Sequence, residues 1–234
     1  MRARVPACTL ALTVVLTACG RGDAPSRKAD SEPPTDLTRR EILLDPGLPV
    51  WSQEAPDTFL AHFETSAGNF TMEVVRAWAP LGADRFFNLT RLGYYDDARF
   101  HRVVPGFIVQ WGLAGDPNVT GAWIDRTIPD DTVVVASNVR GSVAFAFTEA
   151  DTRSTQIYIN LVDNVRLDAQ GFPPFGQVIR GMDVVDAIFG GYGEDSGGGM
   201  RAGRQDSLIA RGNSYLDRAF PDLDRIRRVR VEVH

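Results

Sequence analysis

Two polar side chains set among hydrophobic residues, Arg102 and Gln110, are the first candidates for chemistry in this sequence. They lie in two short apolar runs on either side of the turn dipeptide Pro105-Gly106, a pattern that predicts a partly buried hairpin. A cation fixed among hydrophobic groups can stabilise electron density that develops on a bound substrate. The simpler alternative is that Arg102 is an ordinary strand residue whose charge reaches water.

Other common catalytic sites leave no trace in the sequence. It contains no Gly-x-Ser-x-Gly, no His-Glu-x-x-His and no glycine loop followed by Lys-Ser/Thr. The only histidines are His62, His101 and His234, and no two of them have the spacing of metal ligands. We therefore expect neither a metal nor a cofactor. The formal net charge of -5 also argues against nucleic acid as a partner.

Several motifs, in a fixed order, resemble those of the cyclophilins, the peptidyl-prolyl cis/trans isomerases. The hairpin around Arg102 resembles the central motif, and the resemblance covers roughly residues 58–190 and a last strand. It implies a mainly β fold, a closed eight-stranded antiparallel barrel capped by two α-helices. The other matching segments are Glu64-Thr65-Ser66-Ala67-Gly68-Asn69-Phe70, Phe86-Phe87-Asn88-Leu89, Gly93-Tyr94-Tyr95-Asp96, Gly141-Ser142-Val143-Ala144-Phe145-Ala146, Ser154-Thr155-Gln156-Ile157-Tyr158-Ile159-Asn160 and Phe175-Gly176-Gln177-Val178.

The resemblance implies a catalytic role for Arg102 and Gln110. Arg102 would donate a hydrogen bond to the prolyl nitrogen of a twisted X-Pro bond, with Gln110 and Gln156 as polar supports. Because an arginine near the surface contributes little to stability, we expect its removal to abolish activity without affecting the fold. The alternative for each apolar position, taken alone, is ordinary core. The substrate-binding positions implied by the resemblance are Phe107, Ile108, Phe145, Ala146, Gln156, Tyr158, Leu167 and Phe172.

The sequence departs from the family pattern at several positions of the expected site, including Phe172, which falls near a position often occupied by histidine. Tyr158 stands where phenylalanine is usual and adds a hydroxyl that needs a partner. Phe147 replaces the usual asparagine of the substrate strand, and Arg166 stands where an aromatic residue lines the pocket rim. Arg166 predicts weak inhibition by cyclosporin, because its charge must lose water against an apolar macrocycle. The alternative function is a proline-binding module or holdase of the same fold with little turnover.

Hydrophobic periodicity predicts the elements that position these residues. Alternating apolar residues indicate a hairpin over residues 59–74 and a last strand at residues 229–233. Pro80 suits the first turn of a helix and Gly93 its end, and a second helix is expected at residues 182–189. The remaining strands are expected at residues 99–104, 107–112, 132–136, 142–147, 156–161 and 175–179.

The N-terminus has the pattern of a bacterial lipoprotein signal. Arg2 and Arg4 precede an apolar run at residues 10–16 that is too short to span a bilayer, and Leu16-Thr17-Ala18-Cys19 resembles a lipobox. We expect cleavage before Cys19, lipidation of this cysteine and attachment to a membrane through the lipid alone. The alternatives are an ordinary signal peptide with a chance cysteine and a short buried helix.

Two further segments lie outside the family pattern. Residues 19–57 are rich in proline and predict an extended tether, but Thr38 and Glu41 match a capping box, which leaves open that residues 36–52 fold back on the domain. Residues 190–224 are an insertion ahead of the last strand. They begin with a glycine-rich stretch, expected to be a flexible loop, and continue as one or two short helices.

Together these features predict a lipid-anchored prolyl isomerase of the bacterial cell envelope, facing the periplasm or the exterior. Residues 1–18 are the expected signal peptide, and residues 58–234 the cyclophilin-like domain. The expected partners are proline-containing segments of other exported proteins, whose folding the enzyme would assist. We expect it to act as a monomer.

Overall fold

The computed structural model describes residues 36–132, 135–197 and 205–233, all of which belong to one compact unit, Ser31–His234. The expected signal peptide, Cys19 and the first part of the tether lie outside the described residues. Within those described ranges, no helix has the length and apolar content needed to cross a bilayer.

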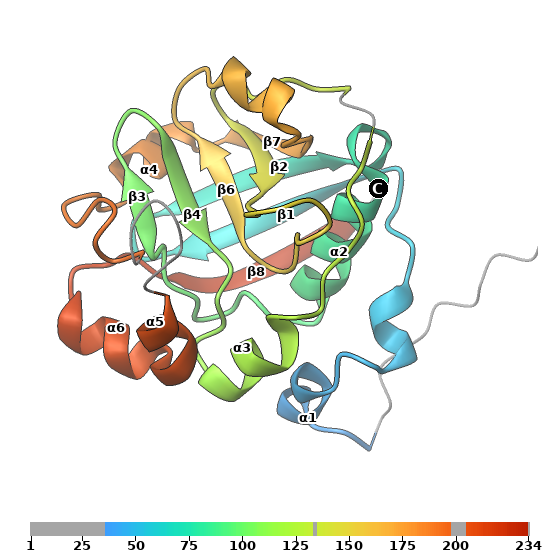
Figure 1. Cartoon of the computed structure of the whole chain (residues 1–234), viewed down its shortest axis with the longest axis vertical. Coiled ribbons are helices and arrows are strands. Elements are labelled where there is room, and N and C mark those ends of the chain that lie inside the picture. Colours follow the sequence, from blue (N-terminus) through green and yellow to red (C-terminus); the bar gives the residue numbers. More distant parts are fainter. Residues whose placement is uncertain (1–35, 133–134, 198–204, 234) are drawn as a thin grey trace, which may run out of the picture. The chain divides into compact units, whose positions relative to one another are not determined.

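A curled sheet of eight antiparallel strands forms the centre of the fold (Figure 1). Across the sheet the strands follow the order β3-β4-β6-β5-β7-β2-β1-β8. The outermost strands are therefore β3, which carries Arg102, and β8, the last strand. The bounds are β1 (Thr58–Thr65), β2 (Asn69–Val75), β3 (Arg102–Val104), β4 (Ile108–Trp111), β5 (Ser142–Phe145), β6 (Ile157–Asn160), β7 (Pro174–Arg180) and β8 (Ile226–Val233).

The prediction of a closed barrel is not met, because no strand ladder joins β3 to β8 in the described part of the chain. Just before these strands, Arg99 and Arg225 form an isolated antiparallel bridge between the two edges. Beside it, the backbone N–H of Phe100 donates to the carbonyl oxygen of Asp224 at 3.0 Å. Since β3 is only three residues long, it offers too little backbone for a continuous ladder with β8.

Aromatic side chains fill the inner face of the curled sheet. Along β1, buried and partly exposed side chains alternate, and Phe59 and Phe63 point inward as the sequence predicts. The ring of Phe63 lies 5.6 Å from that of Trp111, and the ring of Phe59 lies 6.2 Å from that of Phe86. Each such side chain contributes about 1.5–3 kcal/mol by its burial. Because side chains occupy the interior, a substrate site has to lie on the outer face of the sheet.

The two expected helices are α2 (Pro80–Arg91) and α4 (Met182–Ala187). Gly93 follows α2 with a φ of 77°, a left-handed conformation that glycine adopts without strain. The expectation of two helices was nevertheless incomplete, because the stretch after β4 contains a further helix, α3 (Pro117–Trp123), capped by the side chain of Asp116. Five of the six additional strands correspond to β3–β7. Of the one expected at residues 132–136, residues 132, 135 and 136 are described, and none of them lies in a strand.

Residues 36–57 fold back on the domain, so this part of the predicted tether is packed. Helix α1 (Arg39–Leu44) begins with the predicted capping box, in which Thr38 accepts from the backbone of Glu41 and the Glu41 side chain accepts from the backbone of Thr38. A 3₁₀ turn, η1 (Pro49–Ser52), then places Trp51 edge-on against Trp123, with ring centroids 4.5 Å apart. The indole N–H of Trp123 donates to the carbonyl oxygen of Leu43 at 2.8 Å.

The insertion supplies two short helices, α5 (Asp206–Arg211) and α6 (Asn213–Ala219), as the sequence predicts. Leu208 and Leu216 are buried and form a small hydrophobic cluster with Leu113. Arg99 anchors α6 to the edge of the sheet through a salt bridge of 2.8 Å to Asp217.

Candidate active site

A row of cross-strand neighbours brings the predicted site residues together on the outer face of the sheet. Arg102 on β3 pairs in register with Gln110 on β4, which pairs with Tyr158 on β6, which in turn pairs with Ala144 on β5. Paired residues in a sheet point to the same face. The hairpin prediction is therefore confirmed, and it places a guanidinium, an amide and an apolar surface side by side.

Polar side chains hold the guanidinium of Arg102 on this face. Its Nη1 donates to Oε1 of Gln110 at 2.9 Å, and Nε2 of Gln110 donates to Oε1 of Gln156 at 3.0 Å. Gln156 extends this series of hydrogen bonds, because its Nε2 donates to Oε1 of Gln205 at 3.1 Å. Only 8% of Arg102 is exposed, so the interpretation of Arg102 as a solvated strand residue is wrong. The side chain is both buried and engaged.

Glu194 is a partner of Arg102 that the sequence does not predict. Its two carboxylate oxygens accept from Nε and Nη2 of Arg102, each at 2.7 Å, which makes a bidentate ion pair. Glu194 lies in the insertion, on the glycine-rich stretch that the sequence predicts to be a flexible loop. In Figure 1 this stretch follows α4 and lies beside β3. The only sequence signal available was an acidic residue next to glycines, which does not identify a partner 92 residues away.

Tyr158 and Ala144, the apolar end of this row, belong to an apolar cluster on the outer face, which we call the outer cluster. Its buried members are Ile108, Ala144, Tyr158 and Leu167, and Phe107, Ala146 and Phe172 pack against them. Leu167 comes from a 3₁₀ turn, η3 (Val165–Gln170). The predicted apolar site residues Phe107, Ile108, Ala146, Tyr158, Leu167 and Phe172 thus share one cluster.

Phe145 is the exception among the predicted substrate-binding residues. It belongs to the interior core, where its ring lies 5.2 Å from that of Phe175, and only 1% of it is exposed. Side chains alternate between the two faces along a strand, so Phe145 cannot share the outer face with its neighbours Ala144 and Ala146. The prediction of Phe145 as a pocket residue is therefore wrong.

The hydroxyl that Tyr158 adds to the site has a partner. It donates to Oδ1 of Asn138 at 2.9 Å, and burial raises the pKa of Tyr158. Asn138 is itself buried, and its amide nitrogen donates to Asp168 and to the carbonyl oxygen of Phe172, both at 2.8 Å. This network ties the floor of the outer cluster to η3.

The rim of the outer cluster carries the two unusual residues noted in the sequence. Arg166 lies over the ring of Phe107, with Cζ 4.9 Å from the ring centroid. Phe147 stacks on Phe172 with ring centroids 4.1 Å apart, so both rings border the apolar surface. An arginine and a stacked aromatic pair thus replace the aromatic rim and the asparagine expected from the family pattern.

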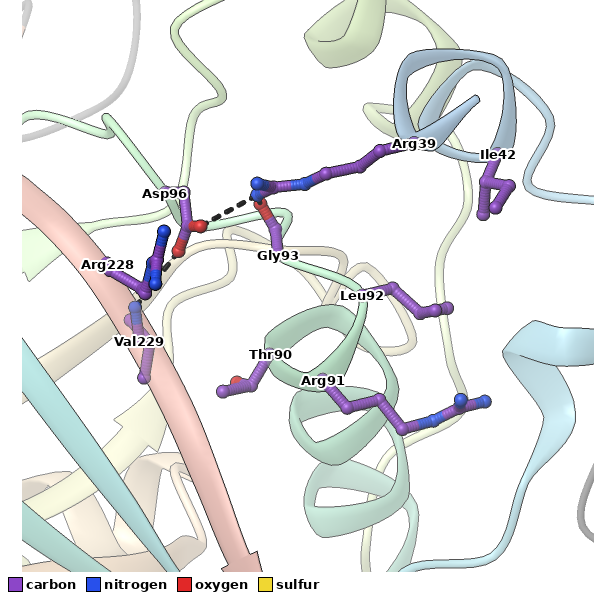
Figure 2. A pocket seen from close by; sticks show the side chains of 9 residues that line it. All are labelled: Arg39, Ile42, Thr90, Arg91, Leu92, Gly93, Asp96, Arg228 and Val229. Carbon is purple, nitrogen blue, oxygen red and sulfur yellow. Dashed lines mark hydrogen bonds and ion pairs between the residues drawn. The ribbon is translucent and has the colours of Figure 1, made fainter. Parts of the chain in front are cut away.

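A cavity of about 310 Å³ lies elsewhere, between α1, the end of α2 and β8 (Figure 2). None of the predicted site residues lines it. Two of its charged groups are engaged: Arg39 donates to Asp96 at 2.8 Å and to the carbonyl oxygen of Gly93, while Asp96 also accepts from the backbone N–H of Val229. This cavity separates the folded-back segment from the sheet and is not the candidate active site.

Comparisons with known proteins agree on one family. The family description "Cyclophilin type peptidyl-prolyl cis-trans isomerase/CLD" matches residues 60–202. The chain is 31% identical over 157 residues to a peptidyl-prolyl cis-trans isomerase of Acinetobacter baylyi, which covers 65% of this chain and 82% of that protein. It is 32% identical over 155 residues to peptidyl-prolyl cis-trans isomerase B of Escherichia coli, which covers 63% of this chain and 94% of the relative.

A solved structure supports the fold. The crystal structure of a cyclophilin-type peptidyl-prolyl cis-trans isomerase from Cryptosporidium parvum superposes with a TM-score of 0.54 at 20% identity. The match covers 76% of this chain and 99% of the other. At this level of identity, the likeness concerns the arrangement of the strands and helices.

Proposed function

Since this chain belongs to the cyclophilin-type peptidyl-prolyl cis-trans isomerase family, we propose that it catalyses rotation about X-Pro peptide bonds of polypeptides. The observation that carries the proposal is the buried guanidinium of Arg102, held by Gln110 next to the outer cluster. A hydrogen-bond donor and an apolar surface are the two features that this reaction requires.

Rotation about an X-Pro bond is slow because resonance between nitrogen and carbonyl must be lost, at a cost of about 18–20 kcal/mol. Without a catalyst it takes tens to hundreds of seconds. In the twisted transition state the prolyl nitrogen regains its lone pair and becomes a hydrogen-bond acceptor. Arg102 donates to that nitrogen and so favours the transition state over the planar ground state.

The outer cluster binds the proline ring. Ile108 and Leu167 are buried at its floor, and Phe107 provides a partly exposed aromatic face beside Arg102. Apolar walls exclude water, which strengthens the hydrogen bond from Arg102 because the local dielectric constant is low. Gln156 and the backbone of Ala146, joined by a hydrogen bond of 2.9 Å from Ala146 N to Gln156 O, border the path of the substrate backbone.

The test is a proline isomerisation assay on the full-length chain, purified in detergent, with Arg102→Ala as the control. The wild type should accelerate cis/trans exchange of an Ala-Pro-containing peptide, and Arg102→Ala should lose about 100- to 1,000-fold of that acceleration, since removal of one preorganised donor costs ~3–4 kcal/mol. Peptide binding without acceleration by the wild type would instead favour a proline-binding module or holdase.

We propose further that the enzyme is a lipoprotein of the bacterial cell envelope that acts as a monomer on exported proteins. The support is the sequence Leu16-Thr17-Ala18-Cys19 behind a short apolar run. Acyl chains on Cys19, each contributing about 0.8 kcal/mol per buried methylene, would hold the domain at the membrane surface.

Expression in a bacterium tests the anchor. The wild type should partition into detergent with a mass raised by acyl chains, whereas Cys19→Ser should carry no lipid and remain a precursor. Recovery of the wild type as an unmodified periplasmic protein would overturn the lipoprotein proposal and leave the isomerase proposal intact. Size-exclusion chromatography of the wild type in detergent checks the monomer.

A further inference from the structure

Glu194 and Gln110 grip the guanidinium of Arg102 from two sides. The carboxylate of Glu194 accepts hydrogen bonds from Nε and Nη2 at 2.7 Å each, and the amide oxygen of Gln110 accepts one from Nη1 at 2.9 Å. A guanidinium has five N–H groups in a fixed plane. Three are therefore engaged, and one N–H remains on each of Nη1 and Nη2. The ion pair fixes the plane of the group and still leaves donors for a substrate.

The loop that carries Glu194 is itself anchored next to Arg102. Ser196 is 1% exposed, and its hydroxyl donates to the carbonyl oxygen of His101, the residue before Arg102, at 2.7 Å. Gly197 lies directly on the stem of Arg102, because a Cβ added there would be only 2.7 Å from Cβ of Arg102. At the start of the loop, the backbone N–H of Phe189 donates to Asp224 at 2.8 Å. Glu194 is thus presented by a fixed support.

How firmly the ion pair fixes Arg102 depends on how far it is shielded from solvent. The side chain of Arg102 is 10% exposed and that of Glu194 31% exposed, so solvent screens the pair far less than a surface ion pair. A long arginine side chain has many rotamers, and a bidentate contact selects one of them. A catalytic group held in one orientation before the substrate arrives avoids the cost of reorganisation during the reaction.

We propose that Glu194 is a positioning residue for prolyl isomerisation, one that holds the guanidinium of Arg102 in the orientation that serves the transition state. This inference rests on the proposed isomerase function. It gives the glycine-rich part of the insertion a role: the loop brings a carboxylate to the catalytic arginine, and its glycines let the backbone lie against the arginine stem. Glu194 acts through Arg102 and does not itself touch the substrate.

Three variants of the full-length chain test the role of Glu194. In Glu194→Ala, the on-enzyme exchange rate of a saturating Ala-Pro peptide, measured by NMR exchange, should fall about 10-fold. This is less than the roughly 100-fold that a misplaced catalytic group can cost, because Gln110 still holds Nη1 of Arg102. Peptide affinity should stay within about two-fold, because the outer cluster is intact.

Glu194→Gln keeps one acceptor for Arg102 and should recover part of the rate. Asp195→Asn removes a charge from the same loop, on an exposed residue, and should leave the rate unchanged.

A double-mutant cycle separates positioning from a purely structural role. In an Arg102→Ala background, Glu194→Ala should cause no further loss of rate, because there is no guanidinium left to orient. An equal further loss in that background would show that Glu194 only supports the loop and would overturn the proposal. Thermal unfolding of each variant verifies that the fold is retained.

The rate of Glu194→Ala relative to that of the wild type can also contradict the positioning role. A Glu194→Ala variant as fast as the wild type would overturn the positioning role, and a faster one would show that the carboxylate restrains Arg102. If the wild type is active, either result leaves the proposed function standing. If the wild type and Arg102→Ala both give the uncatalysed rate, the proposed function and this inference fail together.

Discussion

The guanidinium of Arg166 lies over the ring of Phe107, with Cζ 4.9 Å from the ring centroid, while Cζ of Arg102 lies 5.7 Å from the same centroid. One aromatic side chain of the outer cluster therefore contacts two cations. Because Phe107 is partly exposed, Arg166 occupies the border between the apolar surface and solvent. The resemblance to the family predicts an aromatic residue at this position.

The contact between Arg166 and Phe107 predicts poor inhibition by cyclosporin. An apolar macrocycle that covers Phe107 would have to displace or dehydrate the guanidinium, and it would lack an aromatic partner at the rim. Loss of such an anchor costs ~2 kcal/mol, or roughly 30-fold in dissociation constant. Titration of the inhibitor against the wild type and Arg166→Trp measures the effect, and the variant should bind more tightly. Nanomolar inhibition of the wild type would contradict the prediction.

Arg102→Ala is expected to lose activity and also some stability. The sequence predicts little effect on the fold, because it places the arginine near the surface. In the structure, Arg102 is buried, and its removal takes the donor away from the carboxylate of Glu194 and from Oε1 of Gln110. Glu194 is partly exposed and can be hydrated, so the expected loss in the free energy of unfolding is about 1 kcal/mol rather than the 3–5 kcal/mol of a fully buried pair.

Urea unfolding of Arg102→Ala and of Arg102→Ala combined with Glu194→Ala measures that loss. The second substitution removes the unpaired carboxylate and should return part of the stability. If Arg102→Ala unfolds at the same urea concentration as the wild type, the ion pair contributes nothing to the fold. Full activity of Arg102→Ala would show instead that the guanidinium is not the catalytic donor.

Features encoded by neighbouring residues were predictable from the sequence. The alternation in β1, the capping box of Thr38 and Glu41 and the stop at Gly93 each depend on a few adjacent positions. Tyr158 and Ile108 lie together in the outer cluster, where the resemblance puts them by their positions in the strands. The cluster on the outer face follows from strand register, which the resemblance carries over.

Features that depend on distant parts of the chain were not predictable. The pairing of Arg102 with Glu194 joins residues 92 positions apart, and the glycine-rich context of Glu194 gives no indication of what it contacts. Alternation along the strand means that Phe145 and Ala146 cannot both face the pocket, but it does not say which of them does; the pairing of Ala144 with Tyr158 puts Phe145 on the inner face. The open edge between β3 and β8 depends on where the ladder ends, which hydrophobic periodicity does not define.

Burial of His101 predicts a loss of stability in acid. Burial lowers the pKa of His101 from 6.5 to about 4, with a further contribution from the charge of Arg102. Between these two values the unfolded chain binds a proton that the folded protein does not, so the free energy of unfolding falls as the pH drops from 6.5 towards 4. The full window corresponds to about 3 kcal/mol, since one pKa unit is about 1.4 kcal/mol.

Urea unfolding at pH 7 and pH 4.5 of the wild type and His101→Gln checks this effect. Carboxylates titrate in both proteins, so the difference between their pH dependences isolates the histidine. The wild type should lose about 2 kcal/mol more than the variant over this interval. Identical pH dependences would mean that His101 titrates alike in the folded and unfolded states, contrary to its burial.

Trp51 is expected to stabilise the domain by fixing the folded-back segment. It packs edge-on against Trp123 at 4.5 Å, and its indole N–H donates to the carbonyl oxygen of Asp45 at 2.9 Å. Trp51→Ala removes both contacts and should lower the free energy of unfolding by ~2 kcal/mol, whereas Trp51→Phe keeps an aromatic ring and should lose about half as much.

Val162→Ala, a truncation at an exposed hydrophobic residue, is the control and should change stability by less than about 0.5 kcal/mol. The isomerisation rate should stay the same in all three variants, because every contact of Arg102 is retained. A Trp51→Ala variant as stable as the control would contradict the prediction and show that the packing of Trp51 does not stabilise the domain.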